Sequence, residues 1–134
     1  MTAKILIIDD HDDFRQMVKN HLAAQHLDME IFEASSGELG IEKALREKVN
    51  IILMDIRLPN INGIDAATRI RRHLPECRIV VLTMFETEAF RKVFKSGDIT
   101  AYIGKSELYD KLVPVIKGIL KEINGTNKRE VPTS

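Results

Sequence analysis

The sequence predicts an α/β domain built on a parallel sheet with helices on both faces. Three short runs, at residues 5–8, 51–54 and 79–82, are almost wholly apolar, which is typical of strands buried on both faces. Segments with helical periodicity lie between these runs, so strands and helices alternate along the chain. Because parallel strands need crossover connections, this alternation favours a sheet enclosed between two helical layers.

Two weaker runs, at residues 31–34 and 101–103, complete the set of predicted strands. Each of the first three predicted helices has an apolar face whose residues recur every three or four positions. These faces are formed by Phe14, Met17, Val18 and Leu22 in the first helix, Leu39, Ile41 and Leu45 in the second, and Ile64, Ala67, Ile70 and Leu74 in the third.

Turn-forming residues mark where the helices begin and end. Ser36 and Gly37 precede the second helix, and a loop rich in Pro and Asn at residues 59–63 precedes the third. A fourth helix is predicted at residues 86–95. The last helix is expected to begin after Ser106, to be kinked at Pro114 and to end near residues 124–125. We therefore predict one domain over residues 1–123, followed by a polar tail or linker stub at residues 124–134.

Composition and charge exclude several classes of protein. The 134 residues are 44% hydrophobic, which fits one domain with one core. Twenty basic and twenty acidic side chains cancel, so no net charge attracts the chain to nucleic acid or to an anionic membrane. No apolar run is long enough to span a bilayer, and the single cysteine, Cys77, cannot form an internal disulfide. We therefore expect a cytoplasmic protein.

Polar side chains follow four of the five predicted strands. Asp9 and Asp10 follow the first strand, Asp55 the third, Thr83 the fourth and Lys105 the fifth. In an open parallel sheet, ligands bind beyond the carboxyl ends of the strands, near the point where the strand order reverses. Three carboxylates that meet there repel one another unless a cation neutralises them. Oxygen ligands with room for water favour Mg²⁺ as that cation.

A carboxylate beside Mg²⁺, a lysine and a hydroxyl has the groups needed for phosphoryl transfer. The carboxylate attacks phosphorus in line, and the product is an acyl phosphate. Taken singly, an aspartate at a strand end is more often a turn residue or a helix cap, and Asp12 or Asp13 is expected to be such a cap. His11 is interpreted as a solvent-facing residue of the first helical turn, with a metal-ligand role as the alternative.

Four segments of the sequence stand out as a set: ILIIDDHDDFR at the first strand, ILMDIRLPNINGIDA around the third, VVLTMFE at the fourth and AYIGKS at the fifth. Taken together, they resemble the receiver domains of bacterial two-component response regulators, which belong to the CheY-like superfamily. The Lys-Ser pair and the LTMF run are most similar to receivers joined to LuxR/NarL-type helix-turn-helix output domains. The resemblance implies a flavodoxin-like (βα)5 fold: a doubly wound, parallel five-stranded sheet of order 2-1-3-4-5 in a three-layer α/β/α arrangement.

The resemblance also implies a role for each acidic residue. Asp55 would be the phosphoacceptor. Asp10 and Asp55 would bind Mg²⁺ directly, together with the backbone carbonyl of Arg57, and Asp9 would bind it through a water molecule. Lys105 would pair with the acidic site and then with the phosphoryl group.

Further residues would form a switch, again as the resemblance implies. Thr83 would donate a hydrogen bond to a phosphoryl oxygen, and Tyr102 would turn inward as Thr83 moves. The surface formed by the fourth helix, the fifth strand and the fifth helix would then change shape and bind partners. Arg57 and Phe85 could control the access of water to the acyl phosphate. Ser106 follows the lysine where many receivers have proline, so the geometry of that peptide bond is left open.

The function implied is that of a signalling switch and not of a turnover enzyme. Its phosphoryl group would come from a phosphohistidine of a sensor histidine kinase or phosphotransfer protein, and phosphorylation could lead to a homodimer. Two alternatives stay open: a receiver fragment of a LuxR/NarL-type DNA-binding regulator, and a phosphorylation-independent interaction module. A haloacid-dehalogenase-type phosphohydrolase is disfavoured, because Arg57 stands where that chemistry needs a second aspartate.

Overall fold

The computed structural model describes residues 2–84 and 97–130, and their side chains as far as residue 125. Its strands are β1 (Ala3–Ile8), β2 (Met29–Ala34), β3 (Ile51–Asp55), β4 (Arg78–Thr83) and β5 (Ala101–Gly104). Its helices are α1 (Asp12–Ala23), α2 (Gly37–Glu47), α3 (Gly63–His73), a short 3-10 helix η1 (Lys105–Glu107) and α5 (Leu108–Glu130). These elements confirm the predicted ones, except that the helix predicted at residues 86–95 lies outside the described residues.

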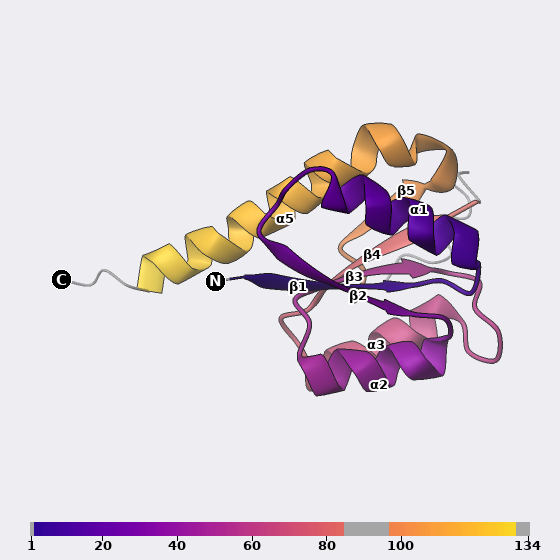
Figure 1. Cartoon of the computed structure of the whole chain (residues 1–134). Coiled ribbons are helices and arrows are strands. Elements are labelled where there is room, and N and C mark those ends of the chain that lie inside the picture. The colour runs from indigo at the N-terminus through magenta and orange to yellow at the C-terminus, as the bar shows by residue number, and fades with distance from the viewer. Residues whose placement is uncertain (1, 85–96, 131–134) are drawn as a thin grey trace.

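The five strands form one parallel sheet of order β2-β1-β3-β4-β5, as predicted. Figure 1 shows α1 and α5 on one face of the sheet and α2 and α3 on the other. The chain adds β2 on one side of β1 and then crosses back to place β3 on the other side. The strand order therefore reverses between β1 and β3, which is where this class of fold forms its ligand site.

Two apolar cores lie on opposite faces of the sheet. Along each strand, alternate residues point to opposite faces, so both faces of a central strand need apolar side chains. The core next to α1 and α5 contains Ile5, Ile7, Ile51, Leu53, Val80, Leu82, Leu22 and Leu112. The core next to α2 and α3 contains Leu6, Ile8, Ile52, Met54, Ile79, Ala44, Ala67 and Ile70. Burial on both faces is the physical reason for the continuous apolar runs of the sequence.

Side-chain caps begin two of the helices. Ser36 Oγ accepts a hydrogen bond from the Leu39 N–H at 3.1 Å, and Asn62 caps α3 in the same way. The prediction that Asp12 or Asp13 caps α1 is wrong, because the N-cap is His11 and both aspartates lie in the first turn. Their charge is favourable there, next to the partial positive charge of the helix N-terminus.

Helix α5 is longer than predicted. It ends at Glu130 and not near residues 124–125. A glycine ends a helix when it adopts the left-handed conformation, and no described glycine has a positive φ angle, so the helix continues through Gly125. The helix is also continuous across Pro114, where the expected kink stays a prediction. Within residues 2–84 and 97–130, no helix combines the length and the apolar character that crossing a membrane requires.

Candidate functional site

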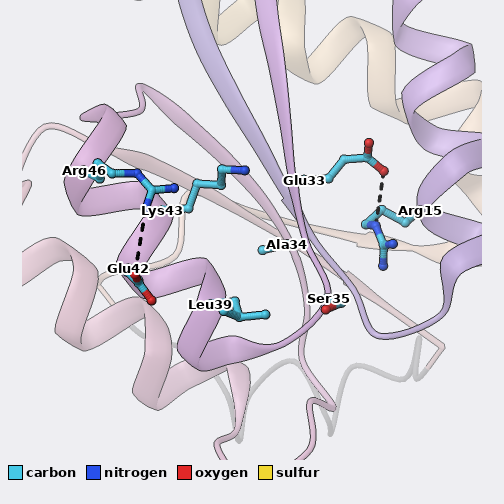
Figure 2. Close-up of a pocket in the computed structure, with 8 residues that line it drawn as sticks. All are labelled: Arg15, Glu33, Ala34, Ser35, Leu39, Glu42, Lys43 and Arg46. Atoms are coloured by element: carbon cyan, nitrogen blue, oxygen red, sulfur yellow. Dashed lines mark hydrogen bonds and ion pairs between the residues drawn. The ribbon is translucent and has the colours of Figure 1, made fainter.

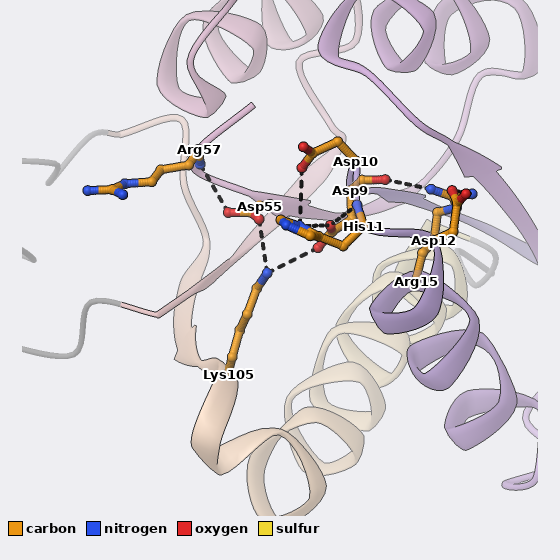
Figure 3. Close-up of polar contacts among 8 residues, drawn as sticks. All are labelled: Asp9, Asp10, His11, Asp12, Arg15, Asp55, Arg57 and Lys105. Atoms are coloured by element: carbon orange, nitrogen blue, oxygen red, sulfur yellow. Dashed lines mark hydrogen bonds and ion pairs between the residues drawn. The ribbon is translucent and has the colours of Figure 1, made fainter. Parts of the chain in front are cut away.

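Four strands end at one edge of the sheet, and the residues at their ends come together there. Asp9 directly follows β1, Asp55 ends β3, and Lys105 follows β5. Figure 3 shows these three side chains pointing toward one another from separate elements. Thr83 ends β4 next to them and is fully buried. This is the edge at which the sequence predicted a converging site.

The Lys105 ammonium binds two buried carboxylates. Its Nζ lies 2.9 Å from Asp55 Oδ2 and 3.2 Å from Asp9 Oδ2. It also lies 4.2 Å from the centre of the Phe14 ring, which α1 supplies as a cation–π partner. Burial alone would lower the pKa of Lys105, but the hydrogen bonds and charges of Asp55 and Asp9 raise that pKa above its ordinary 10.5. The lysine is therefore positively charged at neutral pH.

Each of these two carboxylates uses its other oxygen to accept a backbone hydrogen bond. The Arg57 N–H donates to Asp55 Oδ1 at 3.0 Å, and the His11 N–H donates to Asp9 Oδ1 at 2.8 Å. Asp9 is only 1% exposed and Asp55 only 5%. Charge-assisted hydrogen bonds of this kind offset the cost of burying a carboxylate. Both carboxylates are thus fixed in position on both of their oxygens.

Asp10 and His11 complete a cluster of potential metal ligands. His11 Nδ1 lies 3.3 Å from Asp9 Oδ1 and 3.3 Å from Asp10 Oδ1. Ligand atoms of Asp9, Asp10, His11 and Asp55 all lie within 4.8 Å of one another. Three carboxylates at this range repel one another and are compatible with a bound divalent cation. The structure therefore brings together the predicted acidic residues and adds His11 to them.

A cavity of about 340 Å³ opens beside Asp55. Its lining combines a carboxylate, an ammonium and a hydroxyl with apolar side chains. The lining residues are His11, Asp55, Ile56, Arg57, Thr83, Met84 and Lys105. Met84 is 76% exposed, so it lies at the opening of the cavity. The cavity offers room for a small anionic group in contact with Asp55.

A second cavity, of about 290 Å³, lies beside the edge strand β2 (Figure 2). Much of its charge is already paired within the protein. Arg15 binds Glu33 at 3.2 Å, and Arg46 binds Glu42 at 3.7 Å. None of the polar residues that follow β1, β3, β4 and β5 lines this cavity. We therefore place the functional site at the cavity beside Asp55.

Arg15 is a residue of the site that the sequence reasoning missed. Its Nη1 donates a hydrogen bond of 2.6 Å to the backbone carbonyl of Asp9, while its Nε binds Glu33 of β2. The side chain is only 15% exposed. Arg15 therefore links the loop that carries Asp9 to the edge strand. The spacing of Asp12 and Arg15, three residues apart at the start of a helix, is the signal that points to an ordered arginine.

The residues predicted to control water access and to form the switch lie in or near the cavity where the structure describes them. Arg57 lines the cavity, and Tyr102 is half-buried on β5, opposite Val81 of β4. Phe85 lies outside the described residues. The peptide bond between Lys105 and Ser106 is trans, as are all the peptide bonds of the described residues.

Comparison with known proteins gives a consistent result. The chain matches the family model of the response regulator receiver domain over residues 5–117. It is 34% identical over 109 residues to the response regulator protein VraR of Staphylococcus aureus, a match that covers 79% of this chain and 51% of VraR. The chain thus spans about half the length of the curated relatives that it matches.

Solved structures agree with this match. A LuxR-family two-component response regulator from Aurantimonas is 30% identical, with a TM-score of 0.80 over 91% of this chain and 87% of the other. The response regulator TrrA from Thermotoga maritima, solved in complex with Mg²⁺ and BeF, is 27% identical, with a TM-score of 0.78 over 87% of this chain and 98% of the other. By its sequence, its fold and the residues at the ends of its strands, the chain belongs to the response regulator receiver domain family.

Proposed function

We propose that the chain is a phosphorylation switch of a two-component system and that Asp55 accepts the phosphoryl group. One observation carries this proposal: the Asp55 carboxylate lies in a cavity, 2.9 Å from the Lys105 ammonium, in a cluster with two further aspartates. A receiver domain of this kind acts as a phosphoacceptor, and its turnover is limited to slow phosphotransfer and self-catalysed dephosphorylation.

Asp55 supplies the nucleophile. One carboxylate oxygen forms the new bond to phosphorus while the bond between phosphorus and the donor breaks, and the donor leaves with that electron pair. Backbone and side-chain hydrogen bonds hold both oxygens of Asp55 before the reaction, so little reorganisation is needed when phosphorus approaches. The product is an acyl phosphate on β3.

The acidic cluster fits a magnesium ion, because its donors are mainly carboxylate oxygens with ligand atoms within 4.8 Å of one another. Asp10, Asp55 and the backbone carbonyl of Arg57 would bind the ion directly, and Asp9 would bind it through water. When bound, Mg²⁺ neutralises negative charge on the phosphoryl oxygens.

Lys105 and Thr83 would stabilise the phosphoryl group from the other side. The Lys105 ammonium lies 2.9 Å from Asp55 and is positively charged at neutral pH. It can therefore stabilise the negative charge of the phosphoryl oxygens once the group is bound to Asp55. Thr83 lines the same cavity and carries a hydroxyl that can donate to one of these oxygens. Arg57 and Phe85 would control how water reaches the acyl phosphate.

The signal would leave the site through β4 and β5. A hydrogen bond from Thr83 to the phosphoryl group would move Thr83, and Tyr102 on the neighbouring strand would then turn inward. Tyr102 lies opposite Val81, two residues before Thr83 on β4, so both residues belong to the same pair of adjacent strands. The output surface would consist of the region after β4, together with β5 and α5.

The donor would be the phosphohistidine of a sensor histidine kinase or of a phosphotransfer protein, and the phosphorylated form could dimerise. We further propose a cytoplasmic location. Because the matched relative VraR is about twice as long as the matched region, a second candidate is that the chain is the receiver part of a LuxR/NarL-type transcriptional regulator. In that case a separate domain, and not this one, would bind DNA.

The test is intact-mass spectrometry after incubation with acetyl phosphate, with Mg²⁺ or with EDTA. We expect the wild-type protein to gain one phosphoryl group only with Mg²⁺, and Asp55→Asn to gain none. Hydroxylamine should remove the added group, because it cleaves an acyl phosphate but not a phosphoester. Asp65→Asn, which changes an exposed aspartate of α3, is the matched control and should be phosphorylated like the wild type.

Two results would contradict the proposal. Phosphorylation of Asp55→Asn to the wild-type level would place the phosphoryl group on another residue. If the folded wild-type protein gained no phosphoryl group at any Mg²⁺ concentration, the chain would be a phosphorylation-independent interaction module.

A further inference from the structure

We propose that His11 is a metal ligand, through Nδ1, and that the site therefore binds Mn²⁺, Co²⁺ and Zn²⁺ through nitrogen as well as oxygen. This inference rests on the proposed function, because it assumes that the acidic cluster binds a divalent cation. It goes beyond that function by giving the site a fourth protein side chain and a preference among metals.

The position of His11 is the first argument. Its backbone N–H donates to Asp9 Oδ1 at 2.8 Å, so the residue is attached directly to the cluster. Its ring nitrogen Nδ1 lies 3.3 Å from a carboxylate oxygen of Asp9 and 3.3 Å from one of Asp10. Figure 3 shows the ring beside these two aspartates, while the side chain is 69% exposed, in agreement with the solvent-facing position expected from the sequence. The nitrogen thus already points at the atoms that a cation would share.

The spacing of the ligand atoms is the second argument. A metal ion with ligands at about 2.1 Å holds two opposite ligands about 4.2 Å apart. The four ligand atoms of the cluster lie within 4.8 Å of one another, so small side-chain rotations are enough to close them around an ion. The side chains of His11 and Asp10 are 69% and 32% exposed, and can rotate without disturbing the core.

The chemistry of imidazole is the third argument. Mg²⁺ prefers oxygen ligands, whereas imidazole suits Zn²⁺, Cu²⁺ and Ni²⁺, and the affinity of a site for divalent metals rises from Mn²⁺ through Co²⁺ to Cu²⁺. An imidazole at this place should therefore add affinity for the later metals and little for Mg²⁺. Among the described residues, His11 is the only histidine in the cluster.

The direct test is pulsed electron paramagnetic resonance of Mn²⁺ bound to the full chain. A coordinated imidazole modulates the electron spin echo of Mn²⁺ through its ¹⁴N nucleus. We expect this modulation in the wild-type protein and its loss in His11→Ala and His11→Gln. The matched control is His73→Ala, which removes an exposed histidine at the far end of α3, and which should retain the modulation.

A second measurement compares metal affinities by isothermal titration calorimetry. His11→Ala should weaken Co²⁺ and Zn²⁺ binding by at least about 10-fold, because replacing a residue that only orients a metal ligand already costs about 10–100-fold. Its Mg²⁺ affinity should fall much less, so the ratio of the Co²⁺ affinity to the Mg²⁺ affinity should decrease. His11→Gln should behave in the same way, because its amide offers an oxygen and not an imidazole nitrogen.

Three results would overturn the inference: no ¹⁴N modulation in the wild type, modulation that persists in His11→Ala, or an equal loss of affinity for Mg²⁺ and Co²⁺. The last result would mean that His11 only positions Asp9 and Asp10. These failures can be told apart from failure of the proposed function, which is measured separately as Mg²⁺-dependent phosphorylation of the wild-type chain.

Discussion

At the scale of single residues, three carboxylates lie together at the carboxyl edge of the sheet, and two of them contact Lys105. Lys105 lies 2.9 Å from Asp55 and 3.2 Å from Asp9, whereas Asp10 contacts the ring of His11 at 3.3 Å. The cluster therefore has an excess of negative charge when no cation is bound, and this repulsion lowers the stability of the folded state. A cation that binds only the folded state restores this stability.

Asp10→Asn should make the metal-free protein more stable. Removing one of three like charges should raise the free energy of unfolding by about 1 kcal/mol, the Coulomb energy of two unit charges about 4 Å apart in water. Mg²⁺ should stabilise the wild type but not this variant. Urea denaturation with Mg²⁺ and with EDTA measures both effects.

The control is Asp13→Asn, which removes an exposed aspartate from the first turn of α1, outside the cluster. This variant should be slightly less stable than the wild type, because its charge is favourable at a helix N-terminus. If both variants shifted in the same direction, repulsion within the cluster would not be the cause.

At the scale of helices and strands, α3 begins in direct contact with the end of β3. The Gly63 N–H donates to the carbonyl of Ile56 at 2.9 Å. A Cβ atom at Gly63 would lie 2.9 Å from the carbonyl oxygen of Asp55 and 2.9 Å from the Cα of Ile56. These are backbone atoms, which cannot rotate out of the way as a side chain can. The start of α3 therefore helps to fix the position of Asp55.

Gly63→Ala should destabilise the protein by about 1–3 kcal/mol, the usual cost of overpacking a well-packed interior. Gly118→Ala is the matched control, because a Cβ there meets no atom within 4 Å and the residue is exposed on α5. This control should be more stable than the wild type by up to about 1 kcal/mol, since alanine favours helix more than glycine does. Thermal or urea unfolding of both variants tests whether the first lowers the free energy of unfolding and the second raises it.

A charged cluster joins α1 to β2. Lys19 and Arg15 bind Glu33 at 3.0 Å and 3.2 Å. Burial alone would raise the pKa of Glu33, but the hydrogen bonds and charges of Lys19 and Arg15 outweigh it and hold that pKa below its ordinary 4.5. The stabilisation from this carboxylate is therefore present above pH 4.5 and is lost as the pH falls through the lowered pKa.

Glu33→Gln should accordingly be less stable than the wild type at neutral pH, by at most about 1 kcal/mol because the cluster is partly exposed. The difference between the two proteins should shrink as the pH falls below 4.5. Urea unfolding over a series of pH values measures it. Glu42→Gln changes an exposed pair on α2 and should stay close to the wild type throughout. A constant difference between Glu33→Gln and the wild type would exclude the charged cluster as its source.

At the scale of the whole molecule, α5 contributes to the core with side chains from Leu108 to Ile123, within the part of the helix whose side chains the structure describes. Its buried residues are Leu108, Leu112, Ile116 and Ile119, with Ile123 partly buried behind them. The helix continues to Glu130, but Asn124 is already exposed. Among the side chains that the structure describes, the core contacts of α5 therefore extend to Ile123, and the domain boundary at residue 123 stays a prediction.

If the predicted boundary is right, a chain that ends at Asn124 should be as stable as the full chain to within about 0.5 kcal/mol, because it keeps every buried residue that the structure describes. A chain that ends at Lys117 loses Ile119, whose burial is worth about 1.5–3 kcal/mol, and should unfold at much lower urea. Circular dichroism during urea titration compares the two. A large loss of stability in the chain that ends at Asn124 would place the domain boundary beyond residue 124.

Much of the fold could be predicted from the sequence, because its signals are local. Apolar runs at residues 5–8, 51–54 and 79–82 became central strands, since a strand buried on both faces needs apolar residues at every position. The same reasoning placed Asp55 and Lys105 at one edge of the sheet, because parallel strands end on the same side. The end of α5 was predicted wrongly, because a glycine ends a helix only in a backbone conformation that Gly125 does not adopt.

The sequence by itself determined the order of strands and helices and the residue types that meet at the carboxyl edge. The tertiary structure decided which atoms make contact there. One carboxylate oxygen of Asp9 accepts a hydrogen bond from Lys105 and the other accepts one from the His11 N–H. Arg15 donates to the backbone carbonyl of Asp9. The physical reason is that periodicity depends on neighbours along the chain, whereas the choice of hydrogen-bond partner depends on side-chain rotamers and on packing between segments distant in sequence.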